Sequence, residues 1–314
     1  MTPNQCYYLS NRNNFSGISM AQFVRIRDFN CKYKVSGNME SKHTILFLNG
    51  IASTIESWNY HRKRFEKDYK IIGLEYRGQW HSDATPGPYT FKNHAVEVVE
   101  LLKYLEVENV HIISTSLGGE VCMQLAIDFP EIVKSITVIA SVSEADDILL
   151  RQVGRWKDFA KLTVEKHDSQ PEEQRQEFLK ESAHQFLHNA IPEMYGNKFY
   201  NEQFQIIKER DGMFMDSVTR NFFAGHALLC EMFEGIADKE KMTPNLHKIK
   251  CPALIIAGGK DILKLPEYSQ IIADNIPDSD YVVFPDAGHA VAVEKASRIC
   301  DLAEGHIKRA RDNA

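Results

Sequence analysis

The sequence predicts an α/β fold in which a mostly parallel, twisted sheet is wrapped by helices and carries a helical cap. Short apolar runs recur along the chain, as is typical of strands buried on both faces. Helix-length amphipathic stretches separate these runs, which indicates crossover connections between parallel strands. A long central region holds helix-length stretches and no such run, and this indicates an inserted helical unit.

The expected strands follow the order of the apolar runs. A hairpin comes first, because residues 22–29 and 31–35 alternate between apolar and polar side chains around a turn at Asp28-Phe29-Asn30. Buried strands are expected at residues 44–48, 70–76, 110–114, 135–140, 253–257 and 281–284. Helices are expected at residues 94–105, 117–129, 267–275 and 295–310.

The chain is expected to divide into a core and a cap. Residues 1–142 and 249–314 hold every expected strand and form the two parts of the core. Residues 143–248 hold helix-length stretches rich in large apolar side chains, which predicts a helical cap over one end of the sheet. Residues 1–20 are rich in Asn and Ser without periodicity, and we expect a loose lead-in there.

Composition narrows the classes of function. The chain has 314 residues, of which 43% are hydrophobic, so it can bury a sizeable core. A net charge of −6 argues against nucleic acid as a partner, and no run of about 18 apolar residues predicts a membrane span. No secretory signal or Cys-x-x-Cys pair is visible. We expect a cytoplasmic protein without metal or cofactor, since no phosphate-binding loop occurs either.

The segment Ser114-Thr115-Ser116-Leu117-Gly118 is the first candidate catalytic feature. It lies between an expected buried strand and an expected helix. A serine on such a turn is held out at the carboxyl end of the sheet, where substrates reach parallel sheets. The Leu117 amide begins the helix and is placed to stabilise a developing oxyanion. We predict Ser116 as a nucleophile; a plain helix N-cap is the alternative.

Two partners follow Ser116 in chain order. Asp261 comes after the expected strand over residues 253–257, and His289 comes after the strand over residues 281–284. Serine, acid and histidine in this order are expected when the three lie at successive strand ends of one sheet. His289 would take the Ser116 proton, and Asp261 would orient the imidazole and stabilise its charged form. Each residue alone also fits a structural role, but together they predict a catalytic triad.

Further motifs carry a family resemblance. Residues 49–51 (NGI) are similar to a His-Gly-x motif, and residues 75–82 (EYRGQWHS) to Asp-x-Arg-Gly-x-Gly-x-Ser. Gly288-His289 with Glu294 is similar to a closing Gly-His-x-x-x-x-Glu. Residues 22–142 and 249–310 thereby resemble the α/β-hydrolase superfamily. The resemblance implies a serine hydrolase with a helical lid, in which the Ile51 amide joins the Leu117 amide as the oxyanion hole.

Three positions depart from these motifs. Asn49 stands where the family usually has histidine, and Ser114 and Trp80 stand where it usually has glycine. None of the three removes a catalytic atom. Trp80 is expected to alter the loop beside the pocket. Serine at position 116 disfavours the branches that use an aspartate nucleophile.

Two other groups of residues are alternative candidates for functional roles. Glu144, Asp146 and Asp147 follow the expected strand over residues 135–140 and are reserve candidates for the triad acid. His184 and His188 have the i, i+4 spacing of two metal ligands on one helix face. Without a His-Glu-x-x-His motif or a third ligand, a role in the surface or packing of the cap is favoured for them.

The predicted function is hydrolysis of a small-molecule ester, thioester or lactone with a hydrophobic acyl group. Large apolar side chains are expected to line its pocket, namely Trp80, Trp156, Phe159, Met213, Phe214, Phe222 and Phe223. The same triad also suits acyl transfer, cyclisation or carbon–carbon bond hydrolysis. A non-catalytic ligand-binding member of the fold is the remaining alternative. No feature of the sequence selects an oligomeric state.

Overall fold

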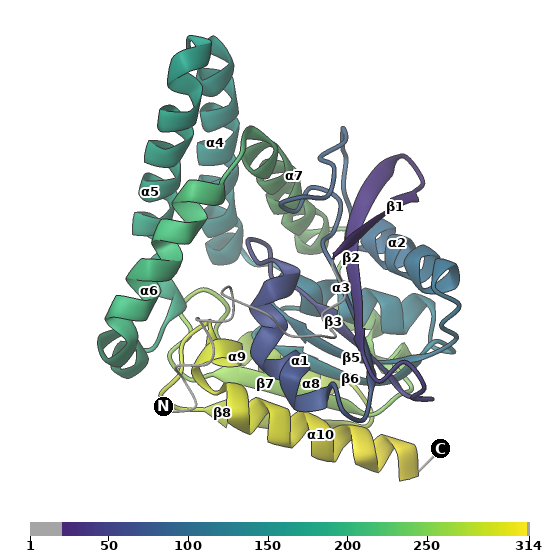
Figure 1. Ribbon diagram of the computed structural model, residues 1–314. Helices are drawn as coiled ribbons and strands as arrows, with labels where there is room; N and C mark the ends of the chain where they lie inside the picture. Colours follow the sequence, from purple (N-terminus) through teal and green to yellow (C-terminus); the bar gives the residue numbers. More distant parts are fainter. Residues whose placement is uncertain (1–20, 313–314) are drawn as a thin grey trace.

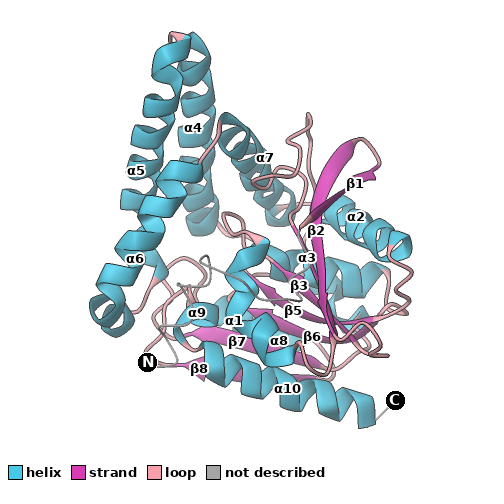
Figure 2. Ribbon diagram, viewed as in Figure 1, coloured by secondary structure: helices cyan, strands magenta, loops and turns pink. Residues whose placement is uncertain are grey.

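The structure is a computed structural model that describes residues 21–312, except for the side chains of residues 189–193. The lead-in expected over residues 1–20 lies outside the described residues. Eight strands form one sheet in the order β1-β2-β4-β3-β5-β6-β7-β8, with helices on both faces (Figures 1 and 2).

The sheet is antiparallel at one edge and parallel elsewhere. The strands are β1 (Gln22–Ile26), β2 (Phe29–Gly37), β3 (Thr44–Leu48), β4 (Lys70–Leu74), β5 (Val110–Thr115), β6 (Val133–Ile139), β7 (Ala253–Gly258) and β8 (Ser279–Phe284). β2 pairs antiparallel with β1 and β4, and the pairs from β4 to β8 are all parallel. The predicted mostly parallel α/β fold is confirmed.

The first hairpin turns earlier than predicted. Ile26 pairs with Phe29, so the turn consists of Arg27 and Asp28, and Arg27 has a φ of 51°. The prediction of a turn at residues 28–30 was wrong. Ile26 and Phe29 are both buried, and a two-residue turn is what places both side chains on the core face of the sheet.

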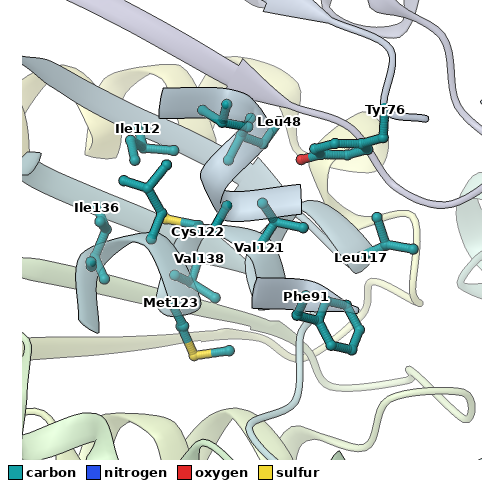
Figure 3. Packing of buried hydrophobic residues seen from close by; sticks show 14 of the residues in the cluster. Leu48, Tyr76, Phe91, Ile112, Leu117, Val121, Cys122, Met123, Ile136 and Val138 are labelled. Atoms are coloured by element: carbon teal, nitrogen blue, oxygen red, sulfur yellow. The ribbon is translucent and has the colours of Figure 1, made fainter. Parts of the chain in front are cut away.

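Helices cover both faces of the sheet because successive apolar side chains of a strand point to opposite faces. Leu46 and Leu48 of β3 face the cluster that includes α2 (Phe91–Tyr104), α3 (Leu117–Asp128) and α8 (Pro266–Asn275) (Figure 3). Ile45 and Phe47 face the cluster that includes α1 (Asn59–Phe65) and α10 (Ala296–Asp312). This two-sided burial produces the uninterrupted apolar runs seen in the sequence.

Side chains at the helix starts set their boundaries. The Thr90 hydroxyl accepts a hydrogen bond from the Asn93 amide, so α2 begins at Phe91, three residues before the predicted start. Asp146 caps the next helix in the same way through the Leu149 amide. A capping residue satisfies a backbone N–H that the helix leaves unpaired.

Four long helices lie between β6 and β7, and we call them the cap helices. They are α4 (Asp147–Ser169), α5 (Arg175–Met194), α6 (Asn197–Ser217) and α7 (Arg220–Ala237). Figure 1 shows α4, α5 and α6 standing out beyond the end of the sheet, with α7 between them and the core. A Cβ on Gly225 would lie 1.9 Å from the Gly78 carbonyl oxygen, so glycine is required where α7 meets the core. Short helical segments complete the described chain at residues 55–58, 172–174, 243–248 and 291–294. None of the described helices is long and apolar enough to cross a membrane.

His111 of β5 makes the stability of the fold pH-dependent. Its ring is buried beside the Ser135 hydroxyl at 2.9 Å, and burial lowers the pKa of His111 from 6.5 to about 4. Below about pH 6.5 the unfolded chain takes up a proton that the folded protein does not, so stability falls as the pH falls toward 4. His111→Asn retains a hydrogen-bonding partner for Ser135 and does not titrate.

Between pH 7 and pH 5 we therefore expect the wild type to lose about 2 kcal/mol more unfolding free energy than His111→Asn. Urea denaturation at the two pH values measures the difference. Equal losses in the two proteins would contradict this role of His111.

Candidate active site

Ser116 lies on the tight turn between β5 and α3. Its backbone has φ 52° and ψ −123°, a conformation that residues other than glycine rarely adopt. Strained backbone of this kind is concentrated at functional sites, where the surrounding structure holds it in place. The side chain reaches the wall of a cavity at the carboxyl end of the parallel strands. The turn thus presents the Ser116 hydroxyl to the cavity.

Two glycines allow this turn. A Cβ on Gly118 would lie 2.3 Å from the Leu48 carbonyl oxygen, and a Cβ on Gly119 would lie 1.9 Å from the Ser141 hydroxyl. Both distances are shorter than any real contact of a Cβ atom. Helix α3 can therefore begin this close to β3 and β6 only with glycine at both positions.

Two departures from the family motifs are accommodated inside the core. Ser114 is fully buried, and its hydroxyl donates to the Thr137 carbonyl of β6 at 2.8 Å. Asn49 is also fully buried, and its amide nitrogen donates to the Leu74 carbonyl of β4 at 2.7 Å. Each polar side chain thus ties its strand to a neighbouring strand.

Ser116, His289 and Asp261 form one hydrogen-bonded chain. The Ser116 Oγ lies 3.1 Å from His289 Nε2, and His289 Nδ1 lies 2.7 Å from Asp261 Oδ2. All three side chains are at least nine-tenths buried. The structure thus brings together the three residues predicted as a triad, from loops that follow β5, β7 and β8.

Backbone amides hold the acid in place. Asp261 Oδ1 accepts hydrogen bonds from the amides of Leu263 at 2.9 Å and Lys264 at 2.8 Å, which leaves Oδ2 for His289. Two fixed donors on one carboxylate oxygen prevent rotation of the group. The imidazole is therefore held with Nε2 toward Ser116.

The reserve acids have other partners. Asp146 accepts from the Leu149 amide at 2.9 Å and from the Tyr268 hydroxyl at 2.5 Å. Glu144 lies 3.8 Å from the ammonium of Lys241, and Asp147 is exposed. The carboxylate that is hydrogen-bonded to His289 Nδ1 is that of Asp261.

Glu294 connects the histidine loop to the cap. Its Oε1 accepts hydrogen bonds from the Gly288 amide at 2.8 Å and from the Gly196 amide at 3.1 Å. Gly196 lies in the turn between α5 and α6, and the Ala290 amide also donates to the Met194 carbonyl at 2.6 Å. These hydrogen bonds join the loop that carries His289 to the turn between α5 and α6.

Gln79 orients the loop after β3, a role that the sequence motifs did not predict. Its Nε2 donates to the carbonyl oxygens of Gly50 at 2.7 Å and Ile51 at 3.2 Å, while its Oε1 accepts from the Tyr76 amide at 3.0 Å. In a trans peptide the N–H points opposite to the C=O. The bond to the Gly50 carbonyl thus sets the direction of the Ile51 N–H, one of the two predicted oxyanion donors. The motif alone marked position 79 as variable.

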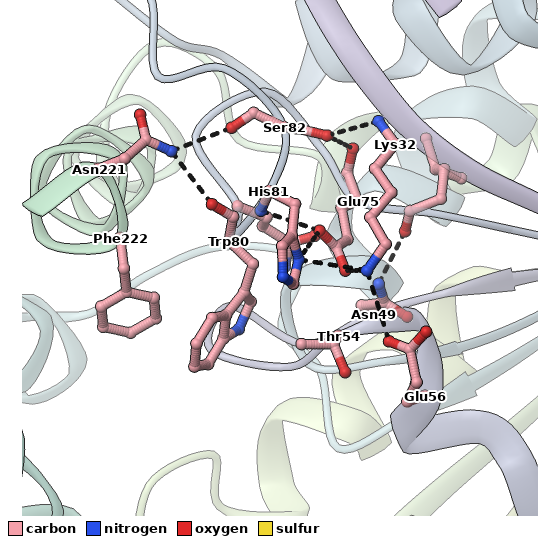
Figure 4. Close-up of polar contacts among 12 residues, drawn as sticks. Lys32, Asn49, Thr54, Glu56, Glu75, Trp80, His81, Ser82, Asn221 and Phe222 are labelled. Atoms are coloured by element: carbon pink, nitrogen blue, oxygen red, sulfur yellow. Dashed lines mark hydrogen bonds and ion pairs between the residues drawn. The ribbon is translucent and has the colours of Figure 1, made fainter. Parts of the chain in front are cut away.

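The Trp80 loop is clamped between core and cap. Trp80 has a φ of 36°, the left-handed backbone for which the family usually has glycine at this position. Its indole N–H donates to the Ala52 carbonyl at 2.9 Å. The Asn221 amide of α7 donates to the carbonyls of Trp80 at 3.1 Å and Ser82 at 3.2 Å (Figure 4).

A buried ion pair supports the base of the same loop. The Glu75 carboxylate at the end of β4 is fully buried and accepts from the Lys32 ammonium at 3.0 Å and from the His81 amide at 3.0 Å (Figure 4). The Ser82 hydroxyl donates to the Glu75 carbonyl at 2.7 Å. These contacts give residues 75–82 one fixed conformation beside the cavity.

The cavity has a volume of about 520 Å³ and extends from Ser116 to the cap helices. Of the residues predicted to line the pocket, Trp80, Trp156, Met213 and Phe214 lie on this wall. The structure places Phe159, Phe222 and Phe223 in a packed cluster of aromatic and apolar side chains and not on the wall. The Phe159 ring of α4 lies 6.2 Å from the Phe223 ring of α7, and the Phe222 ring contacts the rings of Trp80 and Phe214. Further apolar wall residues come from both core and cap, including Ile51, Leu149, Val153, Phe186, Leu187 and Met194.

A buried ion pair that the sequence motifs did not predict lies close to Asp261. The Lys264 ammonium contacts both carboxylate oxygens of Glu120 at 2.8 Å, and both side chains are almost fully buried. Glu120 also accepts from the Val142 amide at 2.7 Å. Burial raises the pKa of Glu120 and lowers the pKa of Lys264, because it disfavours each charged form. The pair joins α3 to the loop that carries Asp261.

No cluster that could hold a metal ion is found among the described residues. His184 and His188 are exposed on α5 with parallel rings whose centres lie 6.3 Å apart. The five cysteines in the described part of the chain are free thiols.

Comparison with known proteins agrees with this architecture. Residues 43–296 match the family described as the alpha/beta hydrolase fold. A 3-oxoadipate enol-lactonase 2 from Acinetobacter baylyi is 22% identical over 283 residues, which are 90% of this chain and 95% of the lactonase.

Solved structures resemble most of the chain. An alpha/beta hydrolase enzyme from a Medee basin deep-sea metagenome library has a TM-score of 0.79 and 22% identity, covering 91% of this chain and 97% of that one. An enol-lactonase from Burkholderia xenovorans has a TM-score of 0.74 and 18% identity, covering 91% and 100%. The family match extends over most of the chain and includes the strands that carry Ser116, Asp261 and His289. The protein belongs to the alpha/beta hydrolase fold family.

Proposed function

We propose that this protein is a serine hydrolase that cleaves an ester, thioester or lactone with a hydrophobic acyl group. The observation that carries the proposal is the hydrogen-bonded chain from Asp261 through His289 to Ser116, at the wall of a largely apolar cavity. A nucleophile, a base and an orienting acid at these distances are the parts that acyl transfer to serine needs. The two enol-lactonases among the similar proteins support the inclusion of lactones.

In the proposed mechanism, Ser116 Oγ attacks the carbonyl carbon while its proton passes to His289 Nε2. The negative charge that develops on the carbonyl oxygen is stabilised by the Ile51 and Leu117 amides. His289 then gives its proton to the leaving group as the carbon–heteroatom bond breaks. Water then attacks the acyl-enzyme with His289 as the base. The carboxylic acid product leaves, and the Ser116 hydroxyl is restored.

In this proposal the cap forms the acyl-binding part of the enzyme. Residues 143–248 would be the cap, and residues 1–142 and 249–314 would be the two parts of the core. Trp80 from the core and Trp156 from the cap would contact the acyl group, since both rings lie on the cavity wall. The substrate would then be held between the two units.

Labelling with a fluorophosphonate probe tests the proposal. The wild type is expected to gain one covalent adduct on Ser116, identified by mass spectrometry of the peptide, and Ser116→Ala is expected to gain none. Ser53→Ala is the matched control, because Ser53 also lies on the cavity wall and no hydrogen bond to His289 is found for it. Absence of labelling in the wild type, or labelling of Ser53 in place of Ser116, would refute the proposed nucleophile.

A further inference from the structure

His226 of α7 is a buried imidazole on the cavity wall. Its side chain is 1% exposed, and it lies among the rings of Phe186, Phe222 and Trp156, with centroid distances of 5.1, 5.5 and 6.3 Å. It shares the cavity with Ser116. A polar side chain therefore interrupts an otherwise aromatic part of the wall.

Neither ring nitrogen of His226 has a hydrogen-bond partner among the described residues. Buried polar groups are nearly always paired, because an unpaired one loses its contacts with water and gains nothing in return. Two other buried histidines each have a partner for one ring nitrogen. His111 has Ser135 as a partner, and His94 has Glu97.

The chemistry of the ring limits what it can bind. Burial lowers the pKa of His226 to about 4, so the ring is neutral near pH 7 and offers one N–H donor and one acceptor nitrogen. The aromatic neighbours supply no positive charge for an anion. A neutral oxygen that accepts or donates one hydrogen bond matches this environment.

We propose that His226 is a specificity-determining residue that hydrogen-bonds a keto or hydroxyl oxygen on the acyl part of the substrate. The substrate class is then an oxo- or hydroxyacyl ester, thioester or lactone, and a plain alkanoyl compound is a poorer substrate. The apolar wall around His226 would hold the rest of the acyl group. This inference rests on the proposed function for its reaction, but it concerns the binding of the acyl group.

Matched acyl esters test it. Each pair has the same leaving group and chain length, and one member carries a keto or hydroxyl oxygen at successive positions where the other has CH₂. We expect the wild type to prefer the oxygenated member by at least about tenfold in kcat/KM at one position of the oxygen. At that position the oxygen forms a hydrogen bond with the His226 ring, which otherwise has no hydrogen-bond partner. His226→Phe is expected to bring the ratio close to one, mainly through KM, and His226→Gln to keep part of the preference.

Controls separate binding from packing. Phe186→Leu alters the same wall without removing a hydrogen-bonding group, so the ratio is expected to persist. His226→Phe is expected to keep or raise the melting temperature, since it removes an unpaired polar group. A lower melting temperature together with an unchanged ratio would assign His226 a purely structural role.

Failure of this inference differs from failure of the proposed function. Calorimetric binding of matched oxo and plain methyl ketones to Ser116→Ala reports on His226 without any reaction. Equal binding of the pair, or equal kcat/KM at every oxygen position, would overturn the role of His226 even if Ser116 is labelled. A binding preference that His226→Phe abolishes would support that role even if Ser116 is not labelled.

Discussion

Replacement of His289 by alanine is expected to lower kcat on a p-nitrophenyl ester by about 10⁴- to 10⁶-fold. The structure gives the Ser116 hydroxyl one imidazole partner, at 3.1 Å, so the variant has no base to accept its proton. Binding should change little, because the cavity wall consists mainly of apolar side chains that remain in place. The loss should therefore appear in kcat, measured by steady-state and single-turnover kinetics.

Replacement of the acid, Asp261, is also expected to lower kcat. Asp261→Asn keeps the shape of the side chain but loses the carboxylate opposite His289 Nδ1, and a loss of about 10⁴-fold in kcat is expected. His81→Ala is the control, because His81 also lies on the cavity wall but contacts Glu75. If His81→Ala reduced kcat as much as His289→Ala does, the assignment of the base would be wrong.

Removal of Glu120 is expected to have the largest effect on stability. Glu120→Leu leaves the Lys264 ammonium buried without its partner, and breaking a buried pair in this way costs about 3–5 kcal/mol. The lost free energy of unfolding can be measured by urea denaturation. Because Lys264 follows Asp261 closely in the chain and its amide binds Asp261 Oδ1, activity should fall along with stability.

The double variant Glu120→Leu/Lys264→Met tests the reason for this cost. It removes both charges and replaces them with apolar groups of similar size, so most of the lost stability should return. If the double variant is as unstable as Glu120→Leu, the damage comes from packing around α3 and not from the unpaired ammonium.

The strands and most helices could be predicted from the chain because their signals are local. Residues 45–48 are all apolar, and they are buried in β3 together with Thr44. The order of Ser116, Asp261 and His289 after three strands was also visible, because parallel strands place their carboxyl ends at one edge. The hairpin turn was misplaced because the pairing of Ile26 with Phe29 depends on which face of the sheet is covered.

The fold class and the order of the candidate triad were thus contained in the residue pattern, since apolar periodicity reflects burial and chain order reflects strand succession. The tertiary structure alone decided which groups meet. It placed Gln79 on the Gly50 carbonyl, Lys264 on Glu120, and Phe159 and Phe223 behind the cavity wall. It also left His226 unpaired in that wall. Such contacts join residues far apart in the chain, and their free energy depends on burial and geometry that no local pattern records.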